Sequence, residues 1–169
     1  MNLTIHPDCR AVWNNRVMRC AVGRSGLSTN KREGDGATPV GDFPLREVFY
    51  RTDRLARPLT ILPCRPLQDA DGWCDDPTDP HYNRPVTLPY AASHEEMMRR
   101  DGLYDLVVVL GYNDAPVVAG LGSAIFLHVA APDFAPTEGC VALALADLQA
   151  VAAGFRPGDG IEILPVEGR

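Results

Sequence analysis

Residues 106–110 read LVVVL and residues 124–130 read AIFLHVA, and these two apolar runs decide the class of fold. Both are rich in β-branched or aromatic side chains and are too short for an ordinary helix. We therefore expect both runs to be buried strands of a core sheet. Three further strands are predicted at residues 16–22, 43–50 and 161–164.

Two segments carry helix signals. Residues 93–100 begin with SHEE, which has the spacing of a capping box and predicts a short helix. Residues 143–153 have leucine and alanine at helical spacing, and Gly154 follows at the position where a helix commonly ends. The pattern as a whole predicts a mainly β fold with two or more short helices.

Length and charge limit the architecture and the partners. A chain of 169 residues with 46% hydrophobic and 22% charged residues is typical of one soluble globular domain, which we place at residues 1–169. Sixteen Lys and Arg against 22 Asp and Glu give a net charge of −6. Nucleic acids and anionic membranes attract basic proteins, so we expect neither as a partner. The sequence sets no oligomeric state.

The N-terminal residues and the cysteines bear on the cellular compartment. Residues 1–10 (MNLTIHPDCR) lack the basic region and apolar run of a signal peptide. The five cysteines are an odd number without a C-x-x-C pair, which favours reduced thiols. We expect a cytoplasmic protein, and a periplasmic one if a leader has been removed.

The segment at residues 63–89 is rich in Asp and Pro and is too long for an ordinary connection. Its aromatic residues favour an ordered loop. Trp73 and Arg84 in this loop either line a substrate groove, with Arg84 binding a carboxylate, or only fix the loop to the domain.

Metal binding is the other chemistry that this segment suggests. Cys64, Cys74 and His81 have ligand side chains, but nine residues lie between the cysteines and six lie before the histidine. These spacings do not match the usual zinc sites, so we expect neither a metal nor another cofactor.

The main chemistry is predicted in residues 126–143, FLHVAAPDFAPTEGCVAL. A cysteine attacks as its thiolate, so Cys140 needs a base, and His128 at the end of a strand can supply one. Gly139 leaves the backbone free to present the N–H groups of residues 139 and 140 to an oxyanion. The alternative is structural, because cysteine is often buried and a histidine at a strand end is often a packing residue.

Three motifs together resemble those of one family. Residues 20–45 (CAVGRSGLSTNKREGDGATPVGDFPL), the strand-borne His128 and residues 137–143 (TEGCVAL) are similar to the YkuD/ErfK-type catalytic domain of L,D-transpeptidases. The resemblance spans about residues 16–165. It implies a YkuD-like β-sandwich of mixed sheets and a bacterial enzyme that acts on peptidoglycan stem peptides.

The resemblance also implies roles for single residues. Cys140 would attack the amide between the L-centre of meso-diaminopimelate and D-alanine, and His128 would be its base. An acyl-enzyme would form, and an amine or water would release it. Thr137 would lie beside the nucleophile, and Gly139 would belong to the oxyanion site.

Three positions depart from the pattern of many family members. Glu138 stands in place of a histidine, Ala142 in place of an arginine or asparagine, and Val129 in place of a glycine. These changes keep the nucleophile and the base. They alter the surroundings in which the substrate and an acceptor would be recognised.

Three functions remain open at this point. The first is a cysteine L,D-carboxypeptidase that releases terminal D-alanine from soluble muropeptides during cell-wall recycling. The second is an L,D-transpeptidase that cross-links stems or exchanges D-amino acids. The third is a non-catalytic muropeptide-binding module in which Cys140 is simply buried.

Overall fold

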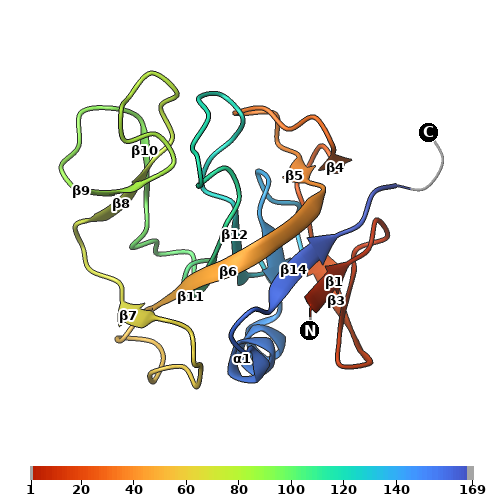
Figure 1. Ribbon diagram of the computed structural model, residues 1–169. Coiled ribbons are helices and arrows are strands. Elements are labelled where there is room, and N and C mark those ends of the chain that lie inside the picture. The colour runs from red at the N-terminus through yellow and green to blue at the C-terminus, as the bar shows by residue number, and fades with distance from the viewer. Residues whose placement is uncertain (1, 167–169) are drawn as a thin grey trace.

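The computed structural model describes residues 2–166, so the predicted domain limits at residues 1 and 169 lie outside the described part. Within residues 2–166 there are fourteen strands and one helix (Figure 1). In chain order the elements are β1 (Asn2–Ile5), β2 (Arg10–Trp13), β3 (Arg16–Ala21), β4 (Leu27–Ser28), β5 (Thr38–Pro39), β6 (Gly41–Tyr50), β7 (Cys64–Pro66), β8 (Asp71–Cys74), β9 (Pro85–Thr87), β10 (His94–Glu96), β11 (Leu106–Leu110), β12 (Phe126–Val129), β13 (Val141–Leu143), α1 (Leu145–Gly154) and β14 (Gly160–Ile163).

The long strand β6 closes the main sheet into a ring. Nine of the described strands follow the order β11-β12-β13-β3-β2-β1-β14-β6-β7. The first part of β6 pairs with β14 and the second part pairs with β11, so β11 at one end of this order meets β6 near the other end. Figure 1 shows the arrow of β6 running across the molecule. The mainly β class is confirmed, whereas the expected β-sandwich of mixed sheets is not.

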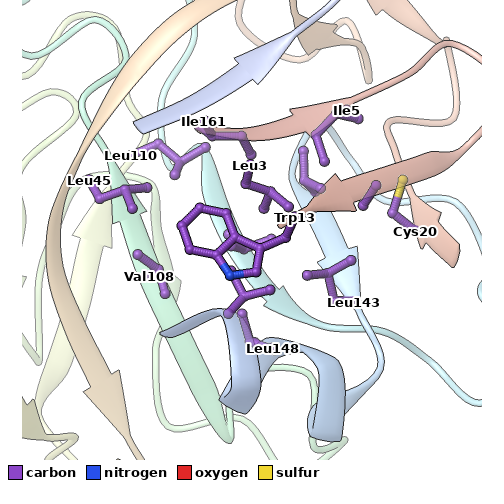
Figure 2. Close-up of a cluster of buried hydrophobic side chains, with 14 of the residues drawn as sticks. Leu3, Ile5, Trp13, Cys20, Leu45, Val108, Leu110, Leu143, Leu148 and Ile161 are labelled. Atoms are coloured by element: carbon purple, nitrogen blue, oxygen red, sulfur yellow. The ribbon is translucent and has the colours of Figure 1, made fainter. Parts of the chain in front are cut away.

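One face of these strands and the helix α1 enclose the larger core. Successive side chains along a strand point to opposite faces, so Leu127 and Val141 turn toward this core while Phe126 and Cys140 turn away from it. Figure 2 shows Trp13 in the middle of the larger core, with Leu148 of α1 below it. Burial of these apolar side chains is the main force that holds the ring and the helix together.

The segment at residues 63–89 is ordered, as expected, and forms most of a second, three-stranded sheet with the order β10-β8-β9. In this sheet Glu95 of β10 lies opposite Trp73 of β8. The helix predicted at residues 93–100 is therefore wrong, because pairing with β8 outweighs the local capping signal. Trp73 and other side chains near this sheet cover the face of the main sheet that carries Phe126.

The other predicted helix is confirmed as α1. Gly154 is its last residue instead of the residue that follows it, and Phe155 is already extended. A Cβ atom on Gly154 would lie 3.1 Å from Nε1 of Trp13, so glycine lets the helix end approach this indole closely. The five predicted strands are also confirmed, and their bounds differ from the observed ones by two residues at most. Among the described residues, α1 is too short and no helix is apolar enough to cross a membrane.

Candidate active site

Two neighbouring parallel strands place His128 and Cys140 on the same face of the main sheet. His128 belongs to β12, and Cys140 directly precedes β13. The register pairs His128 with Ala142, and side chains two residues apart on a strand share a face. Cys140 therefore lies on the face that carries the His128 ring, beneath the segment that connects β8 to β11. His128 and Cys140 are twelve residues apart in sequence, and the segment between β12 and β13 brings the chain back so that the two residues lie on neighbouring strands.

Cys140 and His128 line one cavity of about 190 Å³. Thr137 and Glu138 border it on the side of the turn, and Glu95, Arg99 and Tyr104 border it from the segment between β8 and β11. Part of its wall is made of small apolar groups, which are Ala131, Ala135 and Ala142. The sequence-predicted nucleophile and base are thus brought together in one concave site.

The ring of His128 is held in a defined orientation. Its Nδ1 atom lies 2.8 Å from the carbonyl oxygen of Val129, and because a carbonyl only accepts, Nδ1 carries the proton. The Nε2 atom of the neutral ring is then left with a free lone pair. Burial lowers the pKa of His128 to about 4, so the imidazole is neutral at pH 7. The ring of Tyr104 packs edge-on against it with centroids 5.3 Å apart. His128 is therefore prepared to accept a proton.

The thiol of Cys140 is kept protonated in this structure. Burial raises its pKa to about 12, and the nearby Glu95 adds to this effect. The Sγ atom donates to the carbonyl oxygen of Ala124 at 3.2 Å and accepts from the N–H of Phe126 at 3.4 Å. A thiol in this state becomes a nucleophile only when a base removes its proton. The pair His128 and Cys140 therefore fits general-base activation and not a preformed thiolate.

The turn before Cys140 is fixed by the hydroxyl of Thr137. This hydroxyl accepts from the N–H of Gly139 at 3.1 Å and donates to the carbonyl oxygen of Cys140 at 2.6 Å. Gly139 has φ +141°, and a Cβ atom there would lie 2.9 Å from the carbonyl oxygen of Ala37. Glycine is required at this position on both grounds. The predicted neighbours of the nucleophile thus form its rigid support, with the N–H of Gly139 engaged by Thr137.

Trp73 and Arg84, the other two predicted site residues, lie elsewhere in the described part of the chain. Trp73 is buried, and its ring packs edge-on against that of Phe126 with centroids 5.1 Å apart. Its Nε1–H donates to Oδ1 of Asn83 at 2.9 Å. Arg84 borders a different cavity and donates to the carbonyl oxygen of Asp114 at 2.8 Å. The structure brings neither side chain into the cavity of Cys140 and His128.

The three ligand-type side chains considered for a metal are also distributed over separate elements. Cys64 lies on β7, Cys74 lies on β8, and His81 lies in the turn between β8 and β9. Within residues 2–166, no group of three or more His, Cys, Asp or Glu side chains is arranged to hold a metal ion.

Sequence reasoning missed three residues that border the cavity. Glu95 belongs to residues 93–100, where a helix was predicted, but it lies in a strand where burial raises the pKa of its carboxyl group. The Tyr104 hydroxyl donates to Oε2 of Glu95 at 2.6 Å. The guanidinium of Arg99 lies 5.0 Å from the centroid of the Tyr104 ring and 2.5 Å from Oδ2 of Asp101. No local motif marks these residues, because their place depends on how β10 pairs with β8.

A second cavity of about 220 Å³ meets the first at Cys140. Gly139 and Lys31 border it, and so do four carboxylate side chains, which are those of Glu33, Asp75, Glu95 and Glu138. The nucleophile thus stands between a cavity that contains an arginine and a cavity that is rich in carboxylates.

Comparison with known proteins identifies one family. A family model described as the L,D-transpeptidase catalytic domain, YkuD, matches residues 7–166. The matched range includes both strands that carry His128 and Cys140. No curated protein and no solved structure matches the chain.

Proposed function

The chain belongs to the YkuD family of L,D-transpeptidase catalytic domains, and from this membership we propose that it is an L,D-carboxypeptidase of peptidoglycan stem peptides. The family resemblance carried by the residues around His128 and Cys140 is thereby confirmed, and with it a cysteine-dependent chemistry on peptidoglycan. The finer proposal is that the enzyme releases the terminal D-alanine of a stem and passes the acyl group to water.

The observation that carries this proposal is the presence of Arg99 in the cavity of Cys140 and His128. A peptidase that removes one terminal residue must bind the free carboxylate of that residue, and a guanidinium is well suited to do so. The alanine side chains in the cavity wall form an apolar surface that a methyl group can contact. A terminal D-alanine, with its carboxylate on Arg99 and its methyl against this wall, fits both features.

The proposed reaction uses only the described side chains and water. The thiol of Cys140 turns from Ala124 to the imidazole, gives its proton to Nε2 of His128, and attacks the scissile carbonyl carbon. A thioester forms as the C–N bond breaks, and the imidazolium gives the same proton to the leaving amine. Water then loses a proton to His128 and attacks the thioester. The departing thiolate takes that proton back, which restores the starting enzyme.

We place this reaction in the cytoplasm, on soluble muropeptides that arise during cell-wall turnover. All five cysteines are free thiols in the structure, which fits a reducing compartment. Glu138 and Ala142 border the cavity where many family members carry residues of other chemistry. The methyl group of Ala142 offers no polar partner for a second stem, and water needs none.

Transpeptidation is the second candidate, and the carboxylate-rich cavity favours it. An acceptor amine could approach Cys140 through this cavity as an ammonium group and would be attracted by its carboxylates. The acyl-enzyme would be the same in both cases. The two candidates therefore differ only in what releases it.

Product analysis separates the two candidates. We would incubate the protein with a stem tetrapeptide that ends in D-alanine, with and without millimolar D-methionine, and use Cys140→Ala as the control. We expect tripeptide and free D-alanine in both incubations and neither product with the variant. A tetrapeptide that ends in D-methionine as the main product would overturn the carboxypeptidase proposal in favour of transpeptidation.

A further inference from the structure

Two glutamates border both cavities that meet at Cys140, and they differ in their partners. Glu138 is exposed, and its Oε2 lies 2.9 Å from Nε of Arg24. Glu95 is half-buried, and no cationic group forms an ion pair with it among residues 2–166. A carboxylate that is removed from water without a cation is poorly compensated. Glu95 is therefore the member of this pair that a bound cation would stabilise.

Glu95 is held in a fixed position between the cavities. The Tyr104 hydroxyl donates to its Oε2 at 2.6 Å, and its backbone lies in β10, opposite Trp73 of β8. Figure 1 shows β10 next to β8 at one side of the molecule. The Tyr104 ring is in turn fixed by Phe126 and His128, with centroids 5.8 Å and 5.3 Å away. The packing that orients the base thus also orients this carboxylate.

Asp75 supplies a second acceptor in the carboxylate-rich cavity. It follows β8, and its backbone N–H donates to the carbonyl oxygen of Ser93, which lies just before β10. Its Oδ1 atom is completely buried and has no hydrogen-bond partner among residues 2–166. A buried acceptor without a donor is costly, and a donor on a ligand would remove that cost.

The charges around this cavity also point to a cation. Of its bordering residues only Lys31 is cationic, and the Nζ atom of Lys31 is engaged by Oδ1 of Asp35 at 2.5 Å. Burial is the main cause that raises the pKa of Glu95. The Tyr104 hydrogen bond and the positive charge of Arg99 lower it, and the negative charges of Asp75 and Glu33 raise it further. An ammonium group between these carboxylates would reduce their mutual repulsion and supply the missing donors.

We propose that Glu95, positioned by Tyr104 and assisted by Asp75, binds a primary ammonium group of a substrate beside Cys140. The inference rests on the proposed function, because it assigns a substrate group to the same site. Two sources share this chemistry: a side-chain ammonium on the acyl residue of the stem peptide, and the ammonium of an amine that releases the acyl-enzyme. Glu95 is a specificity-determining residue in either case.

The first arm of the test measures formation of the acyl-enzyme. We would compare a stem tetrapeptide whose third residue has a free side-chain amine with the same peptide N-acetylated at that amine. Loss of a charged hydrogen bond corresponds to about tenfold or more in affinity. If the acyl residue is the source, Glu95→Gln raises KM about tenfold for the free amine and leaves KM for the acetylated peptide unchanged.

The second arm measures how the acyl-enzyme is released. We would supply D-methionine as the amine and determine the ratio of D-methionine-capped product to hydrolysed product. If the amine is the source, Glu95→Gln lowers this ratio about tenfold, while the rate of acylation stays the same. Glu96→Gln, on the same strand but exposed, is the matched control and leaves both arms unchanged.

Asp75→Asn provides a second variant in case Glu95→Gln does not fold. We expect it to raise KM for the free amine if the acyl residue is the source, or to lower the release ratio if the amine is the source. Equal effects of the variants on the free and the acetylated peptide, with an unchanged release ratio, would overturn the inference. So would the absence of any effect. Failure of the proposed function has a different signature, because then neither peptide acylates Cys140 in the unmodified protein.

Discussion

His128 donates from Nδ1 to the backbone carbonyl of Val129, the next residue in the chain, over a distance of 2.8 Å. A backbone carbonyl stays in place whatever the side chain at that position, so the substitution of valine at position 129 leaves the orientation of the imidazole intact. The relationship fixes the tautomer of the base and leaves Nε2 to receive the proton of Cys140.

Replacement of His128 by alanine tests this assignment. We expect His128→Ala to lose more than about a hundredfold in kcat, because the thiol of Cys140 is protonated and the variant lacks the imidazole that lines its cavity. The control is His6→Ala, which should retain activity. His6 directly follows β1, and three strands separate β1 from β12 in the order of the main sheet. Steady-state rates and a circular dichroism melt of each variant provide the measurement. Turnover by a folded His128→Ala protein close to that of the unmodified enzyme would exclude His128 as the base.

The lowered pKa of His128 predicts a pH dependence of stability. The folded-state pKa of about 4 lies below the usual value of 6.5, so the unfolded chain binds a proton first as the pH falls. The free energy of unfolding should therefore decrease between pH 6.5 and pH 4, with a contribution of about 2 kcal/mol from this residue alone by pH 4.5. Denaturant titrations of the unmodified protein and of His128→Gln at pH 7 and pH 4.5 measure it. An identical pH dependence in both proteins would show that His128 is not buried as a neutral ring.

We expect the rate to depend on the hydroxyl group of Thr137 more than on the volume of its side chain. Thr137→Val keeps the volume but removes the hydrogen bonds to Gly139 and to the Cys140 carbonyl, so we expect kcat to fall about tenfold with a smaller change in KM. Thr137→Ser keeps the hydroxyl and should stay within about twofold of the unmodified enzyme. Equal rates for the two variants would mean that the turn before Cys140 does not depend on this hydroxyl.

Gly139 is expected to tolerate no side chain. In Gly139→Ala the new Cβ would approach the Ala37 carbonyl oxygen to 2.9 Å, and the turn would have to move Cys140. A displacement of the nucleophile by about 1 Å costs roughly a hundredfold in rate. Gly120→Ala is the control, because Gly120 also has a positive φ, of +80°, but has nothing within 4 Å of the added Cβ. Loss of activity in both variants to the same extent would assign the effect to backbone strain alone.

The strands were predictable from sequence because their signals are local. The run LVVVL at residues 106–110 is apolar and β-branched throughout, and it forms β11 with the predicted bounds. Residues 93–100 misled the prediction for the opposite reason. Their capping-box pattern is a local helix signal, whereas their structure is decided by β8, about twenty residues earlier in the chain.

The residues of the candidate site also fall into two groups, those that a local motif predicts and those that only strand pairing places. His128 and Cys140 lie in a short motif, so their meeting was predictable from the sequence. Glu95 and Arg99 lie in a segment whose local pattern predicts a helix and marks no site, and only the pairing of β10 with β8 brings them to the cavity. The sequence left two roles open for Trp73, lining a groove or fixing the loop to the domain, and the alternation of side chains along β8 turns it onto Phe126.

The central claim is that Cys140 forms an acyl-enzyme with a stem peptide, and intact-protein mass spectrometry tests it most directly. Enzyme in excess over a tetrapeptide that ends in D-alanine would be quenched with acid at short times, and the adduct located by peptide mapping. We predict a thioester of the tripeptide on Cys140, formed together with free D-alanine and absent in Cys140→Ala. Release of D-alanine by the Cys140→Ala protein, or an adduct located on Cys64 or Cys74 instead, would contradict the account.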